Sequence, residues 1–122
     1  MRKLMLLVAS VALVVAATIT ATASAGDPTA HAAGTRTVTV GDNFFSPKSM
    51  TVKKGTTLSF QWGKGNAGTD QEHNVTGVKG NRFATKDLTH PAKPFRKKIT
   101  KTTLIVCTIH STTMELKVKV KK

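Results

Sequence analysis

The sequence predicts an all-β protein, a single-domain Greek-key β-sandwich of about seven or eight strands. From Thr35 onward, short runs rich in Val, Ile, Thr and Phe alternate with Gly, Pro, Asn and Asp, which is typical of strands joined by turns. No segment of this region has the 3.6-residue apolar period of an amphipathic helix. A length of 122 residues fits one domain. Short strands separated by turns at such spacing usually pack as two sheets.

The first 25 residues are predicted to be an export signal rather than part of the domain. Arg2 and Lys3 give a positive start, residues 4–19 are mostly apolar, and Ala23-Ser24-Ala25 offers the small side chains that a signal peptidase requires. The alternative is an uncleaved membrane anchor, although the apolar run is short for a bilayer span. After cleavage no integral membrane segment is expected. The protein is therefore expected to be exported, to the periplasm or to the cell envelope and exterior.

A flexible linker is predicted at residues 26–34, which are small, polar and rich in alanine. The domain is predicted at residues 35–122. It contains the only cysteine of the chain, Cys107, so no disulfide can form within the molecule. An exported lone thiol has three fates: it is buried and inert, it forms a dimer, or it binds a metal. We expect a monomer.

Each expected strand follows from its own pattern. The run at 57–62 places Leu58, Phe60 and Trp62 on one face, and the run at 116–121 alternates Leu or Val with Lys, so both should be buried on one face only. The segment 102–108 is apolar on both faces and should be central and covered on both sides. The remaining expected strands are 37–40, 49–53, 72–76 and 95–100, with one edge strand within 77–94.

The stretch after the central strand carries the chemistry. Cys107 ends that strand, His110 lies across a tight turn, and Met114 begins the last strand, so the three side chains can converge on one point. His73 would arrive from a separate strand. One thiolate, two imidazoles and a weakly bound thioether suit copper in both of its oxidation states. Asn74 is expected to connect the two loops that carry these residues, and a donor near the sulfur would tune the metal.

Each of these side chains also has an ordinary structural interpretation. A free cysteine behaves as a small hydrophobe, and a methionine fills gaps in a core. His110 alone would be a polar loop residue. His90 and His31 have no motif around them and are interpreted as a loop and a linker residue, respectively. The combination of residues around Cys107, rather than any one of them, favours a metal site.

These residues carry a resemblance to a known family. Residues 40–47 (VGDNFFSP), residues 51–56 (TVKKGT), His73-Asn74-Val75 and the segment from Cys107 to His110 with Met114 together resemble the plastocyanin and amicyanin branch of the cupredoxins. The resemblance covers nearly all of residues 35–122. It implies the cupredoxin fold and one type 1 (blue) copper ion.

The resemblance further implies the roles of the ligands. His73, Cys107 and His110 would be the equatorial ligands and Met114 the axial ligand, with His110 as the electron exit near the surface. The loop departs from the family pattern, because Ile109 stands where proline is common and three residues separate His110 from Met114. Amicyanin-like loops have two residues there and plastocyanin-like loops four. Leu116 also replaces a common glycine.

Three functions compete. The first is a one-electron shuttle between redox partners, which is not an enzyme: four histidines do not supply the extra copper ligands that oxygen or nitrite chemistry needs, and no catalytic pair of carboxylates is evident. The second is a copper carrier or storage protein that uses the same ligands. The third is a metal-free basic module that binds polyanions, although no nucleic acid partner is expected.

The charge is strongly basic, with 19 Lys and Arg against 6 Asp and Glu and a formal net charge of +13. Two interpretations of the lysine-rich strands remain open. They are solvated faces that keep the protein soluble, or they form a docking surface for an acidic redox partner protein.

Overall fold

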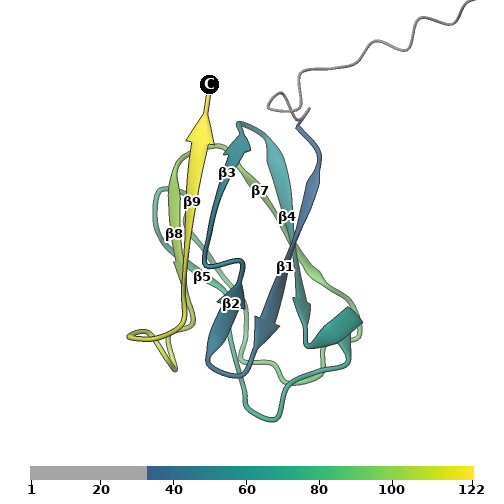
Figure 1. Ribbon diagram of the computed structural model, residues 1–122. Helices are drawn as coiled ribbons and strands as arrows, with labels where there is room; N and C mark the ends of the chain where they lie inside the picture. The colour runs from purple at the N-terminus through teal and green to yellow at the C-terminus, as the bar shows by residue number, and fades with distance from the viewer. Residues whose placement is uncertain (1–32) are drawn as a thin grey trace, which may run out of the picture.

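The computed structural model describes residues 33–122, which form two β-sheets with a common apolar core (Figure 1). The predicted signal peptide at 1–25 and most of the predicted linker at 26–34 lie outside the described residues. Within the described part, no helix is long and apolar enough to cross a membrane. The predicted all-β sandwich is confirmed.

The four-stranded sheet has the order β2-β1-β4-β7 and the five-stranded sheet the order β3-β9-β8-β5-β6. The strands are β1 (Thr35–Gly41), β2 (Phe44–Ser46), β3 (Ser49–Lys53), β4 (Thr56–Trp62), β5 (Thr76–Lys79), β6 (Phe83–Ala84), β7 (Phe95–Ile99), β8 (Thr103–Val106) and β9 (Glu115–Lys121), with one 3-10 turn, η1 (Lys64–Asn66), after β4. Nine strands replace the expected seven or eight. The additional one is β2, whose three residues are too few to show an alternating pattern.

The core lies between the sheets and follows the alternation of the sequence. Leu58, Phe60 and Trp62 of β4 are fully buried, as their shared face predicts. In the other sheet, Leu116 and Val118 of β9 are buried, whereas the alternating lysines of that strand are exposed. Burial of such side chains contributes about 1.5–3 kcal/mol each, so these two strands supply much of the stability of the domain.

Two pairs of strands are parallel and join distant parts of the chain. β1 pairs with β4, and β3 pairs with β9, with Ser49 opposite Lys117 and Lys53 opposite Lys121. β9 therefore lies between β3, to which it is parallel, and β8, to which it is antiparallel. This arrangement makes β8 the middle strand of its sheet, as expected.

Two local expectations are wrong. Residues 72–76 do not form a strand, because β5 begins only at Thr76 and His73 forms an isolated bridge with Leu88. The expected coverage of β8 on both sides also fails at Leu104, which is only half-buried and lies on the outer face of the five-stranded sheet. Both predictions rested on local apolar patterns. Whether a segment pairs as a strand, and whether a side chain is covered, depends on distant parts of the chain that such patterns do not specify.

The two ends of the sandwich differ (Figure 1). The turn between β1 and β2 and the loop between β8 and β9 lie at the lower end of the view, whereas the C-terminus lies at the opposite end. We call the lower end the loop end. It positions the residues that carry the candidate chemistry.

Candidate metal centre

The loop between β8 and β9 brings three of the predicted residues close together. Cys107 directly follows β8, and its N–H donates to the carbonyl of Met114 at 3.1 Å, which closes the loop. Within the loop, the N–H of His110 donates to the carbonyl of Cys107 at 3.2 Å, and the N–H of Met114 donates to the carbonyl of His110 at 2.9 Å. These turns hold the three residues next to one another at the start of the hairpin.

His73 reaches the same point from the opposite part of the chain. It exchanges two backbone hydrogen bonds with Leu88, at 3.0 and 2.9 Å. The indole N–H of Trp62 donates to the carbonyl of Leu88 at 2.9 Å, so the end of β4 supports the segment that holds His73. The side chain of His73 is fully buried.

The geometry of the donors is compact. The Nδ1 atoms of His73 and His110 each lie 3.8 Å from the Sγ atom of Cys107, and the three donor atoms lie within 4.8 Å of one another. Cys107 is fully buried and His110 half-buried. Two ring nitrogens and one sulfur thus face a common point, with one imidazole close to the surface.

Met114 is the fourth predicted residue. It is fully buried and belongs to the same apolar cluster as Cys107, to which it is also joined through the backbone. Its burial and its backbone contact with Cys107 are consistent with the role of axial ligand that the sequence predicts.

Asn74 connects the two loops of the site, as the sequence predicts. Its amide nitrogen donates to Thr108 Oγ1 at 2.7 Å, and its amide oxygen accepts from the N–H of Thr108 at 3.0 Å. Its own backbone N–H points to Cys107 Sγ at 3.5 Å, which is the donor to the sulfur that was expected. Asp87 accepts a further hydrogen bond from the amide of Asn74 at 2.8 Å. The loops that carry His73 and Cys107 are therefore fixed relative to each other.

Asp42 is a residue of the site that the sequence did not reveal. Its Oδ1 accepts a hydrogen bond from His73 Nε2 at 3.0 Å. The carboxylate also accepts from the backbone N–H groups of Asp70 and Gln71, at 3.2 and 3.1 Å. The hydrogen bond from His73, followed by those two backbone donors, holds the pKa of Asp42 below its usual value despite some opposing desolvation. A proton on Nε2 leaves Nδ1 of His73 free for a metal.

The other candidate residues stay outside this cluster. His90 is an exposed loop residue whose ring lies against Gly68. Glu72 is exposed and takes no part in the group of donor atoms. His31 lies outside the described residues. Among residues 33–122, His73, Cys107 and His110 are the one cluster of His, Cys, Asp or Glu donors suited to a metal ion.

The donor set fits copper. Imidazole nitrogens together with a thiolate form the trigonal arrangement of electron-transfer copper sites, and such sites carry a long axial methionine bond. The carboxylate on the far nitrogen of His73 is the partner that metal-bound histidines usually have. The cluster is therefore consistent with a type 1 copper site.

Comparison with solved structures identifies the architecture. Residues of this chain superpose on a plastocyanin from Dryopteris crassirhizoma with a TM-score of 0.53 and 22% identity, covering 70% of this chain and 100% of the plastocyanin. The fold is that of the cupredoxins. An oxidised amicyanin variant matches this chain with a TM-score of 0.53 and 22% identity, over 81% of this chain and 88% of the amicyanin.

A copper-containing nitrite reductase from Thermus scotoductus also matches, with a TM-score of 0.56 and 24% identity. The match covers 70% of the present chain, which spans only 22% of the reductase. No protein-family model and no curated protein matches the sequence. At these identities the likeness establishes the cupredoxin fold.

Asp42→Asn is expected to weaken copper binding by about tenfold or more, because loss of a carboxylate behind a ligand histidine typically costs 10–100-fold in metal affinity. Competition titration against a chelator of known affinity measures the change. Asp70→Asn is the matched control, since Asp70 contacts Asp42 through its backbone N–H. Equal losses in the two variants would show that general negative charge, rather than the contact with His73, supports the metal.

Proposed function

We propose that this cupredoxin is a mononuclear type 1 copper protein that carries single electrons between redox partners. His73, Cys107 and His110 would be the equatorial ligands and Met114 the axial ligand. The observation that carries the proposal is the approach of two imidazole Nδ1 atoms to one buried sulfur, each at 3.8 Å. A buried thiol with two such neighbours is suited to metal binding rather than to packing alone.

Copper in such a site would supply a one-electron couple. The surrounding residues would influence its reorganisation energy and its reduction potential. Burial of His73 and Cys107 excludes water and lowers the reorganisation that a change of charge would require. Asp42 fixes one imidazole, and the N–H of Asn74 is directed at the sulfur. Hydrogen bonds of this kind around a cysteine ligand tune the potential of copper sites.

Electrons are proposed to enter and leave through His110, which is half-buried at the loop end. The neighbouring Ile109 is 47% exposed, although it is a large apolar residue. Phe44, 42% exposed, begins β2 two residues after Asp42. The exposed apolar side chain of Ile109, directly beside the most accessible ligand, supports brief docking of a redox protein there.

The protein is proposed to be a carrier without catalytic activity of its own. The described residues contain the one donor cluster noted above, whereas oxygen or nitrite chemistry would require further copper ligands. The plastocyanin and the amicyanin variant are almost fully covered by this chain, unlike the reductase, of which only a fifth is matched. This favours the small carriers as the functional analogy.

The oligomeric state, the location and the partner of the carrier are also proposed. A lone cysteine and the export features of residues 1–25 support a monomer in the periplasm or the cell envelope. The excess of Lys and Arg over Asp and Glu would attract an acidic redox partner over several ångströms in dilute salt. An electron-transfer rate that does not change with ionic strength would contradict an acidic partner.

The central experiment adds Cu(II) to the purified protein and then applies protein-film voltammetry. We expect one copper per chain, an intense visible absorption from the copper–thiolate bond and a reversible one-electron wave. A colourless protein would contradict the copper site. Rapid transfer of copper to a metal-free acceptor, without a reversible wave, would instead favour the copper carrier or storage function.

A further inference from the structure

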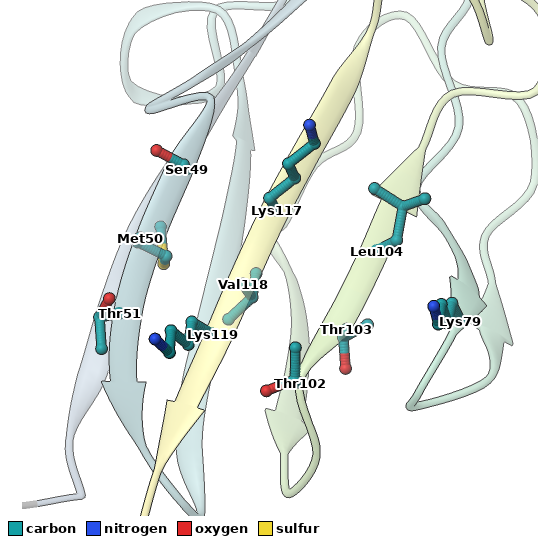
Figure 2. A pocket seen from close by; sticks show the side chains of 10 residues that line it. All are labelled: Ser49, Met50, Thr51, Lys79, Thr102, Thr103, Leu104, Lys117, Val118 and Lys119. Carbon is teal, nitrogen blue, oxygen red and sulfur yellow. The ribbon is translucent and has the colours of Figure 1, made fainter.

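A second surface lies on the outer face of the five-stranded sheet, away from the metal site. It is an open groove of about 810 Å³ over β3, β9, β8 and β5 (Figure 2). It shares no residue with the proposed copper ligands. We call it the lysine groove, defined by Lys79, Lys117 and Lys119 with Ser49, Thr51 and Leu104.

The strand register arranges these side chains in rows. Ser49, Lys117, Leu104 and Lys79 lie opposite one another across four neighbouring strands. The next row begins with Thr51 opposite Lys119. Adjacent strands are about 4.8 Å apart and a two-residue step is about 6.7 Å, so ammonium groups flank Leu104 on both sides and hydroxyls stand beside the lysines of β9. Figure 2 shows the lysine of β5 on the far side of β8 from those of β9.

The lysines of the groove form no salt bridge within the described chain, and the acidic residue nearest to them along β9 is Glu115, two residues before Lys117. Within residues 33–122 no carboxylate lies within salt-bridge distance of a lysine or arginine, and the one close contact between a carboxylate and a basic side chain is the hydrogen bond between Asp42 and His73. Four of the five described acidic residues lie instead in the segments around the metal site; they are Asp42, Asp70, Glu72 and Asp87. The two surfaces therefore differ in the charge that they present.

The composition of the groove distinguishes between polyanions. Protein interfaces are rich in aromatic residues and arginine and poor in lysine, whereas this groove has three lysines and neither arginine nor an aromatic side chain. Single-stranded nucleic acids require aromatic platforms for their bases, and none is present here. A phosphate group, in contrast, accepts from an ammonium and a neighbouring hydroxyl at the same time.

We infer that the lysine groove binds a linear, phosphate-bearing polymer without bases. The polymer lies over β8, with Lys79 on one side and Lys117 and Lys119 on the other. Binding there leaves the loop end, with His110, free for a redox partner. The groove would thus hold the protein on an anionic polymer while the metal site remains accessible.

The test measures binding of fluorescent long-chain inorganic polyphosphate to the metal-free protein in the presence of a chelator, so that copper plays no part. Replacement of Lys79, Lys117 and Lys119 by Gln is expected to weaken binding at least tenfold at low salt. The slope of log K against log salt concentration should fall by about two, because each lost phosphate contact removes about 0.7–0.9 from it. The matched control replaces Lys64, Lys86 and Lys93, which are outside the groove and exposed, and should lose less than threefold.

Equal weakening of both triple variants would overturn the inference in favour of diffuse attraction by net charge. Tighter binding of poly-glutamate than of polyphosphate of equal charge would overturn it in favour of an acidic protein partner. Amide chemical shifts of the wild-type protein provide a second readout that needs no variant. Shifts on β3, β5, β8 and β9 during the polyphosphate titration would support the groove, and shifts confined to other strands would contradict it.

Discussion

Cys107→Ser is expected to abolish the visible colour of the copper-loaded protein. The absorption requires a copper–thiolate bond, and the chain contains no second cysteine that could replace Cys107. The substitution is nearly isosteric. His73 and His110, whose Nδ1 atoms each lie 3.8 Å from the sulfur of Cys107, remain in place. We therefore expect complete loss of the band, with at most weak, colourless copper binding through the imidazoles, measured by absorption and electron paramagnetic resonance.

The control for this result is His90→Ala, which removes an exposed histidine outside the cluster. It should leave colour and copper content unchanged. Circular dichroism of Cys107→Ser should match the wild type, which separates loss of the ligand from loss of the fold. A Cys107→Ser protein that folds and colours as strongly as the wild type would disprove the copper–thiolate site.

Trp62→Ala is expected to cost about 3–5 kcal/mol of unfolding free energy, the usual range for truncation of a buried aromatic residue. Trp62 is fully buried and closes the core at the end of β4. Domains of this kind are stable by only about 5–15 kcal/mol, so the variant should be close to unfolding. Urea unfolding of the metal-free protein measures the change.

Trp62→Phe separates packing from hydrogen bonding. It keeps most of the apolar volume but removes the indole donor from the carbonyl of Leu88, which still accepts from the N–H of His73, so the expected cost is that of one hydrogen bond, about 0.5–1.5 kcal/mol. Because Leu88 pairs with His73, this variant should also bind copper more weakly. An Ala variant that loses less than 1 kcal/mol would show that the core repacks around the missing ring.

The part of the site that the sequence revealed is the part that is local. Cys107, His110 and Met114 lie within eight residues, and the loop between two strands holds them together whatever its exact length. The alternation in β4 and β9 likewise specified which residues are buried. Such features depend on nearest neighbours and on strand period, which a single sequence contains.

The features that the sequence did not reveal depend on distant partners. The structural setting of His73 is determined by Leu88, a pairing outside any strand. Asp42 reaches His73 from a turn 31 residues away. The residues Gly41-Asp42-Asn43 are typical of a turn, and Asn43 adopts a positive φ of 66° there, but no periodic pattern indicates what the carboxylate contacts. Leu104 was expected to be buried because residues 102–108 are apolar on both faces. That pattern cannot show that the outer face of the five-stranded sheet is open.

The parallel pairing of β3 with β9 has a consequence for the order of assembly. β3 can pair with β9 only after β9 is available, and β9 also forms the hairpin with β8. Contacts between such distant segments close slowly, because loop entropy opposes them until the whole chain is available. Three of the four proposed ligands belong to or flank that hairpin. A chain shortened before Glu115 should therefore lose the pairing of β3 with β8 through β9 and the hairpin that holds the copper pocket, so that metal is acquired only once β9 is in place.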